Sequence, residues 1–154
     1  MTYVLRVPYH ALDPDKSRST TPLRVRFCDT DLMGIVHHAT YLAYLEAGRV
    51  DWLRKRGVTY AEWAAGGLHL PVVEAELRYR KPARFDDLIH VETTLSELRM
   101  ASLRFSFRIL RKEELLIEAS TRLACVDDRH TIRRLDASIL SVLQAPESVP
   151  GEIP

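Results

Sequence analysis

The sequence predicts an α+β protein in which one long helix packs against an antiparallel sheet. Two hydrophobic patterns lead to this class. Apolar residues recur at helical spacing over residues 40–56, and after Pro71 the period falls from about 3.6 residues to about 2. The four alternating segments that follow are polar on one side, so their sheet has one solvated face and one apolar face that must be covered. The long helix is the element available to cover it.

Residues 1–22 are expected to form an extension that precedes the domain. Its first part, TYVLRVPY, can form a short edge strand, and its second part, HALDPDKSRSTTP, is a polar linker that contains proline. A single domain is expected over residues 23–146, and a tail over residues 147–154. The domain opens with an alternating strand at residues 24–27.

The long helix at residues 40–56 carries a glycine on its apolar stripe. A glycine in a helix interior costs roughly 1 kcal/mol relative to alanine, so we expect Gly48 to mark a close approach to the covering layer. Opposite charges one turn apart on the same helix predict two surface ion pairs. These pairs are Glu46 with Arg49 and Asp51 with Lys55.

A second, short helix is expected to begin at a capping box formed by Thr59 and Glu62 and to end at Gly66. Near the C-terminus we expect a short strand at residues 131–135, followed by a helix that Asp136 caps. Four strands lie between these two helices. Their alternating apolar positions are Val73 to Tyr79, Ile89 to Leu95, Leu103 to Ile109 and Leu115 to Cys125.

Composition limits the classes of partner. The chain has 154 residues, enough for one domain with a real core, and its 22 basic and 21 acidic residues leave a net charge of +1. No global field therefore attracts nucleic acid or a membrane surface, and no apolar run reaches the ~20 residues of a membrane helix. Cys28 and Cys125 lie in strand-like runs without metal-type spacing. This favours buried free thiols in a cytoplasmic protein, with a disulfide as the alternative.

Residues 24–41, RVRFCDTDLMGIVHHATY, gather groups suited to acid–base or nucleophilic chemistry. Two carboxylates, Asp29 and Asp31, follow the first strand, and two adjacent histidines, His37 and His38, precede the long helix. The free N–H groups and the positive dipole end of such a helix N-terminus stabilise an oxyanion. The segment therefore predicts a site that acts on a polarised carbonyl.

This segment resembles the signature of hotdog-fold acyl-CoA thioesterases of the 4-hydroxybenzoyl-CoA thioesterase type. In that signature D-x-D-x-x-G-x-V follows an aromatic-rich strand, and a Tyr opens the helix. YRKPARFDDLIHVET is similar to a second family segment, and the resemblance covers about residues 23–135. It implies a hotdog fold, in which a five- to six-stranded antiparallel sheet wraps around a long central helix. It also implies a homodimer or homotetramer with active sites at the subunit interface.

The same match implies roles for individual residues. Asp31 takes the position of the carboxylate that acts as nucleophile or general base on the thioester. His38 is the second catalytic candidate, through its backbone N–H and its imidazole. Asp29 is expected to be structural and to cap backbone N–H groups of the turn. The implied substrate-binding positions in this segment are Gly34, Val36, His37 and Tyr41.

Coenzyme A carries phosphates, which require basic side chains near the mouth of the site. Arg99 matches a basic family position that faces the nucleotide, and Arg133 and Arg134 match a basic region near the 3′-phosphate. Coenzyme A is part of the substrate here, and no cofactor is implied. Acyl carrier protein is the alternative carrier of the acyl group.

Other interpretations stay open for this segment. Asp31 is also a favoured residue type for a turn before Gly34. Phe27 departs from the tyrosine of many relatives, which puts any tyrosine-assisted step in doubt. A metal site is disfavoured because adjacent histidines rarely face one ion and no H-E-x-x-H spacing exists.

The leading functional interpretation is a thioesterase that hydrolyses a short- or medium-chain or aromatic acyl thioester. The alternatives are a hotdog dehydratase or hydratase of enoyl thioesters and a non-catalytic acyl-CoA-binding protein. The retained carboxylate at Asp31 argues against the second alternative.

Overall fold

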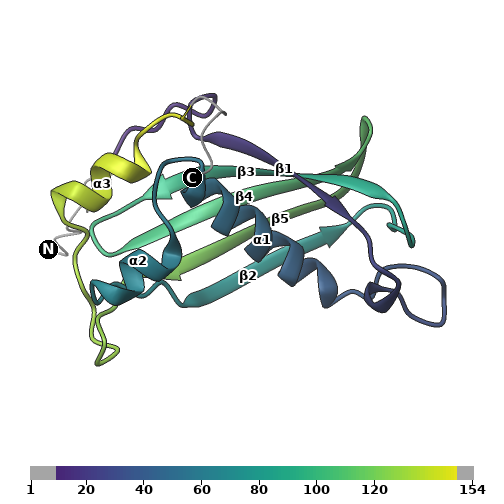
Figure 1. Cartoon of the computed structure of the whole chain (residues 1–154), viewed down its shortest axis with the longest axis horizontal. Coiled ribbons are helices and arrows are strands. Elements are labelled where there is room, and N and C mark those ends of the chain that lie inside the picture. The colour runs from purple at the N-terminus through teal and green to yellow at the C-terminus, as the bar shows by residue number, and fades with distance from the viewer. Residues whose placement is uncertain (1–9, 149–154) are drawn as a thin grey trace, which may run out of the picture.

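Five strands form one antiparallel sheet in the computed structural model, which describes residues 10–148 (Figure 1). The order across the sheet is β1-β3-β4-β5-β2, so β1 and β2 are the two edges. The predicted strands after Pro71 are confirmed. The strands are β1 (Arg18–Arg24), β2 (Val72–Tyr79), β3 (Leu88–Leu98), β4 (Ser102–Arg111) and β5 (Glu114–Ala124).

The first strand lies earlier in the chain than we expected. Residues 18–22, predicted to be linker, pair with β3 as part of β1, and the predicted strand at residues 24–27 gives way to a 3-10 turn, η1 (Phe27–Asp29). The polar strand is stabilised by hydrogen bonds from its side chains to α1: the Thr21 hydroxyl donates to Asp51 at 2.6 Å. The edge strand expected at residues 2–9 lies outside the described residues.

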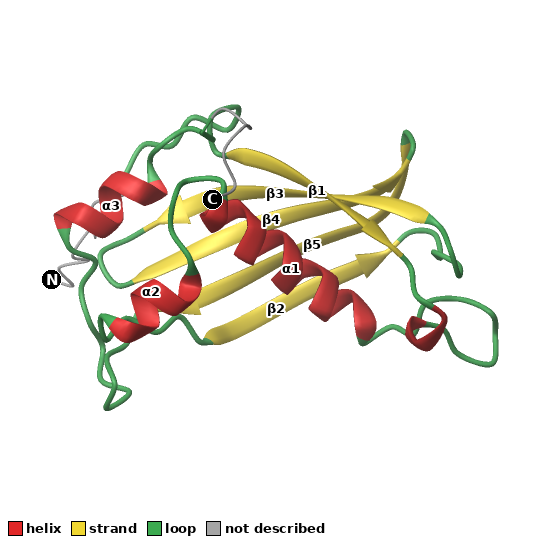
Figure 2. Cartoon of the chain, viewed as in Figure 1, coloured by secondary structure: helices red, strands yellow, loops and turns green. Residues whose placement is uncertain are grey.

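The long helix α1 (Thr40–Arg54) crosses the apolar face of the sheet (Figure 2). The close approach predicted at Gly48 is confirmed. A Cβ at this position would lie 2.7 Å from the Thr93 hydroxyl and 2.8 Å from a methyl group of Val91. Only the glycine lets α1 sit this deeply against β3. Helix and sheet then enclose the fully buried side chains of Trp52 and Phe105.

The two short helices begin at the capping residues that the sequence predicted. Thr59 accepts the N–H of Glu62 and Glu62 accepts that of Thr59, at the start of α2 (Tyr60–Ala65). Asp136 accepts the N–H of Ile139 at the start of α3 (Ala137–Leu143). The strand expected at residues 131–135 is wrong, because this segment makes a single bridge, between Val126 and Ile132.

The two faces of the sheet differ as predicted. The outer face is polar and carries ion pairs between strands: Arg108 on β4 pairs with Glu92 on the neighbouring β3 at 3.1 Å, and Arg104 on β4 reaches across β5 to Glu74 on β2 at 3.4 Å. The inner face is apolar, but α1 packs mainly against β1 and β3. The inner side of β2 is therefore left open, and its Tyr79 is 53% exposed.

The cysteines follow the predicted pattern only in part. Both are free thiols, and Cys125 is buried, which raises the pKa of its thiol to about 12. The expected burial of Cys28 is wrong: it is exposed because it lies in the η1 turn and not in a strand.

Candidate active site

The turn before α1 is built around a buried carboxylate, Asp29, which is 3% exposed. Its oxygens accept the backbone N–H of Arg26 at 2.9 Å, the Arg26 guanidinium at 2.9 Å and the Tyr44 hydroxyl at 2.8 Å. Burial raises the pKa of Asp29, but these hydrogen bonds outweigh it and hold the pKa below its ordinary value. The structural role predicted for Asp29 is therefore confirmed.

Asp31, two residues later, starts a tight turn. The N–H of Gly34 donates to the Asp31 carbonyl at 2.9 Å, and the N–H of Asp31 donates to the Ile35 carbonyl at 3.0 Å. Gly34 has a φ of +73°, a left-handed conformation that favours glycine. A Cβ there would make only an ordinary van der Waals contact with the Arg84 guanidinium at 3.9 Å, so the left-handed φ, and not lack of space, is what favours glycine.

The Asp31 side chain is half-buried and only partly engaged. Its Oδ1 accepts the N–H of Met33 at 2.9 Å, which is the turn interaction expected of an aspartate at this position. Its Oδ2 accepts no hydrogen bond from residues 10–148. One oxygen thus fixes the carboxylate, and the other can meet a substrate or a water molecule.

The two histidines connect this turn to α1. The N–H of His37 donates to the Asp29 carbonyl at 2.9 Å, and His37 Nδ1 accepts the N–H of Ala39 at 3.1 Å. The His38 carbonyl accepts the Tyr79 hydroxyl at 3.0 Å. Within residues 10–148 the N–H of His38 has no acceptor. Both imidazoles are exposed, and their ring centroids lie 4.2 Å apart.

Val36 and Tyr41 lie beneath the loop. Val36 is 3% exposed and its N–H donates to the Ala83 carbonyl at 2.9 Å, while Tyr41 is 2% exposed and its hydroxyl accepts the Ala83 N–H at 3.1 Å. The two residues hold the loop against the β2–β3 connection. Direct contact of either side chain with a substrate stays a prediction.

The predicted nucleotide-binding arginines lie at the other end of the sheet. Arg24, just before the Asp31 loop, pairs with Leu88 at the start of β3, whereas Arg99 follows the end of that strand. Eleven residues of strand separate the two ends by roughly 30 Å. Arg133, which donates to the Gly66 carbonyl at 3.1 Å, and the exposed Arg134 belong to the segment before α3. Within one chain, the end of β3 and the segment before α3 lie far from the loop between β1 and α1, so these arginines do not reach Asp31 (Figure 1).

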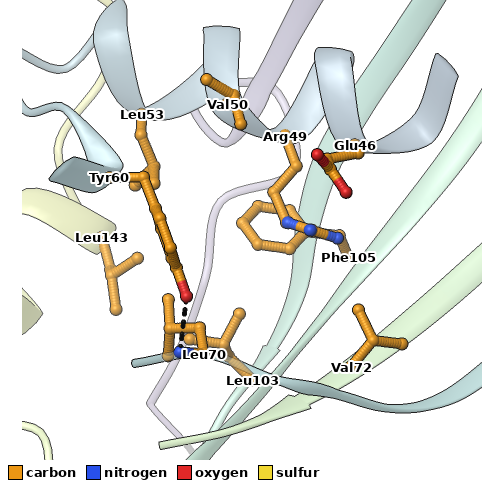
Figure 3. A pocket seen from close by; sticks show the side chains of 10 residues that line it. All are labelled: Glu46, Arg49, Val50, Leu53, Tyr60, Leu70, Val72, Leu103, Phe105 and Leu143. Carbon is orange, nitrogen blue, oxygen red and sulfur yellow. Dashed lines mark hydrogen bonds between the residues drawn. The ribbon is translucent and has the colours of Figure 1, made fainter. Parts of the chain in front are cut away.

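A cavity of about 300 Å³ lies between α1, α2 and the sheet (Figure 3). Sequence reasoning missed it, because the Glu46–Arg49 pair was expected on the surface. The prediction of an ion pair between Glu46 and Arg49 is wrong, because no ion pair joins these side chains and both line the cavity. The predicted Asp51–Lys55 ion pair is confirmed, at 3.2 Å. The remaining lining residues are Val50, Leu53, Tyr60, Leu70, Val72, Leu103, Phe105 and Leu143.

Within residues 10–148, no group of three or more His, Cys, Asp or Glu side chains is arranged to hold a metal ion. No helix in the same range is long and apolar enough to cross a membrane.

Comparison with known proteins gives the family. The thioesterase-like superfamily matches residues 25–151. The acyl-CoA thioester hydrolase YbgC of Escherichia coli is 36% identical over 107 residues, which cover 69% of this chain and 80% of that protein. The chain therefore belongs to the thioesterase-like superfamily. It is a thioester hydrolase with the hotdog fold that the sequence predicted.

Solved structures agree with this assignment. A Thermus thermophilus protein has a TM-score of 0.79 at 42% identity, with coverage of 81% of this chain and 96% of the other. A DHNA-CoA thioesterase from Staphylococcus aureus has a TM-score of 0.75 at 29% identity, with coverage of 77% and 81%.

Proposed function

We propose that this protein is an acyl-CoA thioesterase in which Asp31 is the nucleophile or general base. One observation carries the proposal: Asp31 presents an oxygen without a hydrogen bond in the same loop as the His38 N–H, which has no acceptor within residues 10–148. A thioester needs both groups, one to attack and one to polarise the carbonyl. The named activity of the YbgC relative supports the same substrate class.

The proposed reaction begins when the thioester carbonyl oxygen accepts the His38 N–H at the N-terminal end of α1. The positive end of the helix dipole stabilises the negative charge that develops on this oxygen. Asp31 either attacks the carbonyl carbon, forming a mixed anhydride that water then hydrolyses, or removes a proton from the attacking water. Either route consumes one water and releases a carboxylic acid and the thiol of coenzyme A, and neither requires a separate cofactor.

Other residues of the site have supporting roles. Gly34 is exposed and leaves its side of the loop accessible to the thioester. The exposed imidazoles of His37 and His38 form the rim of the site, where His38 hydrogen-bonds the substrate or the water. Val36 and Tyr41 hold the loop from beneath.

We also propose a homodimer formed through β2, with a homotetramer as a pair of such dimers. The free edge of β2 and the open apolar side of this strand, which includes Val72 at 46% exposure, are liabilities that pairing would remove. Two β2 strands paired antiparallel place the Tyr79 end of one opposite the Val72 end of the other. Tyr79 holds the His38 carbonyl and Val72 lines the cavity, so the Asp31 loop of one chain would lie at the cavity of the other.

The same pairing would bring the arginines of one chain toward the Asp31 loop of the other. The end of β3, which Arg99 follows, and the segment before α3, which carries Arg133 and Arg134, lie at the same end of the molecule as α2, which borders the cavity (Figure 1). A partner's loop would arrive at this end. There the arginines would meet the phosphates of coenzyme A. The free thiols of Cys28 and Cys125 support a cytoplasmic location.

A panel of acyl thioesters with a free-thiol readout tests the activity. The panel contains short-chain, medium-chain and aromatic acyl-CoA compounds, one acyl carrier protein thioester and one 2-enoyl-CoA. We expect thiol release from at least one acyl-CoA with a kcat/KM of about 10⁴ M⁻¹s⁻¹ or more. Hydration of the enoyl-CoA without thiol release would favour the hydratase. If no compound of the panel released a thiol, the proposal would be contradicted.

Sedimentation velocity tests the dimer. We expect a dimer or larger assembly at the protein concentration of the assay. A monomer that hydrolyses acyl-CoA at the full rate would contradict the shared site.

A further inference from the structure

Two arginines, one on α1 and one in the turn that follows it, differ in their hydrogen bonding. The Arg56 guanidinium is buried and donates to the carbonyls of Ala145 at 2.9 Å and Trp52 at 3.0 Å and to the Ser19 hydroxyl at 2.8 Å. Arg49, two turns earlier, donates to no acceptor within residues 10–148 and forms no ion pair there. Residues 10–148 thus supply acceptors for the structural arginine, Arg56, and none for Arg49.

Arg49 reaches from α1 into the cavity between α1, α2 and the sheet (Figure 3). The cavity walls are mainly aliphatic and aromatic, and Glu46 is the only carboxylate among the lining residues. Burial lowers the pKa of Arg49, and Glu46 and Tyr60 act in the opposite sense. A guanidinium that is partly withdrawn from water and has no acceptor within residues 10–148 is destabilised, so the site favours a ligand that brings an acceptor.

We propose that Arg49 binds a carboxylate at the far end of the acyl group, so that the substrates are coenzyme A thioesters of dicarboxylic acids. The apolar walls formed by Leu53, Leu103 and Phe105 would hold the methylene chain. The planar guanidinium fits a carboxylate with two parallel hydrogen bonds, which gives both energy and geometric selection. This inference rests on the proposed thioesterase function and on the β2 pairing that places a partner's Asp31 loop at the cavity.

Pairs of substrates with equal carbon number isolate the terminal carboxylate. Suberyl-CoA is compared with octanoyl-CoA, and adipyl-CoA with hexanoyl-CoA, by kcat/KM in the free-thiol assay. For at least one pair we expect the wild type to prefer the dicarboxylic member by about tenfold or more, the value of a hydrogen bond to a charged group. Arg49→Gln should bring this ratio to about one, mainly through KM, because the carboxylate lies far from the reacting carbon.

Three further variants sharpen the test. Arg49→Lys keeps the charge without the planar fork and should retain part of the preference. Glu46→Gln removes the competing negative charge and should increase it. Arg54→Gln is the matched control, because Arg54 lies on the same helix, is exposed and pairs with Asp51 at 3.7 Å. It should leave the ratio at the wild-type value.

The outcomes separate this inference from the proposed function. A wild-type preference for the monocarboxylic member of both pairs, or a ratio that Arg49→Gln does not change, would overturn the role of Arg49 while the thioesterase stands. If Arg49→Gln weakened the dimer and left the ratio of kcat/KM for the dicarboxylic and monocarboxylic substrates unchanged, Arg49 would belong to the subunit interface. That result would also overturn the proposed role of Arg49.

A binding measurement covers the case in which no acyl-CoA is hydrolysed and the proposed function fails. Calorimetry compares suberyl-CoA with octanoyl-CoA on the wild type and on Arg49→Gln. Tighter binding of suberyl-CoA that the substitution removes would support the carboxylate site without any reaction. Equal affinities of the wild type for the two compounds would overturn it.

Discussion

Asp29 is 3% exposed and accepts hydrogen bonds from Arg26 and from the Tyr44 hydroxyl, whereas Asp31, two residues later, is half-buried and has one oxygen without a partner within residues 10–148. Two aspartates in one short turn thus differ: the Asp29 carboxylate is held by hydrogen bonds, and the Asp31 carboxylate keeps one oxygen available to a substrate or water. A carboxylate that is fully hydrogen-bonded loses basicity and access, so it suits structure better than chemistry. Two arginines on and just after α1 differ in the same way: Arg56 is hydrogen-bonded by the fold, and Arg49 faces the cavity.

The largest effect on stability should come from Asp29→Ala. The substitution leaves the buried Tyr44 hydroxyl and the Arg26 N–H without their acceptor, which should lower the free energy of unfolding by about 2 kcal/mol. Urea denaturation measures this loss. Tyr44→Phe removes only one partner and should cost about 1 kcal/mol. If Asp29→Ala unfolded at the same urea concentration as the wild type, the structural assignment of Asp29 would fail.

The contribution of Asp29 should depend on pH. Because its folded-state pKa lies below the ordinary value, the folded protein keeps the carboxylate ionised at a pH where the unfolded chain binds a proton. The stabilisation is therefore complete above the unfolded pKa of about 4 and is lost as the pH falls through the lower folded value. The gap in unfolding free energy between wild type and Asp29→Ala should shrink as the pH is lowered below 4, as urea titrations at several pH values would show. A gap independent of pH in that range would contradict it.

The smallest effect should come from the arginines at the far end of the sheet. Arg99→Ala, or Arg133→Ala with Arg134→Ala, should raise KM for acyl-CoA a few-fold and leave kcat nearly unchanged, because phosphate contacts stabilise the ground and transition states equally. Steady-state kinetics at rising salt should show the effect fading, as expected for exposed charges. Acyl-pantetheine, which lacks the nucleotide, is the control substrate. Equal losses on both substrates would assign these arginines to the fold, where Arg133 already holds Gly66.

Most of the fold followed from local signals that packing did not override. The period of two predicted β2 to β5, and Gly48 indicated where α1 meets β3. The capping box at Thr59 and the capping aspartate Asp136 predicted the starts of the two short helices. The strand β1 did not follow, because its buried positions are serine and threonine. Ser19 and Thr21 become compatible with the interior only through hydrogen bonds with Arg56, just after α1, and with Asp51 on α1.

The site was predictable only as a set of residues. The sequence pattern identifies Asp29, Asp31, Gly34 and His38 as candidates. It does not show which carboxylate is buried, because that depends on Tyr44, which lies on α1 fifteen residues after Asp29. The cavity could not be predicted, because a helical spacing of Glu46 and Arg49 is also that of a surface ion pair. Only the placement of α1 over the sheet brings both side chains to the cavity.

The central claim is that Asp31 carries out the chemistry and Asp29 supports the fold. The most direct measurement is kcat for the best acyl-CoA of the panel with the Asp31→Asn and Asp29→Asn proteins, each assayed well below its melting temperature. Asp31→Asn keeps the Met33 contact through its amide oxygen and should melt like the wild type, yet lose about 100-fold or more in kcat. Asp29→Asn should melt earlier and keep most of its turnover while folded. Near wild-type turnover by a folded Asp31→Asn protein would contradict the account.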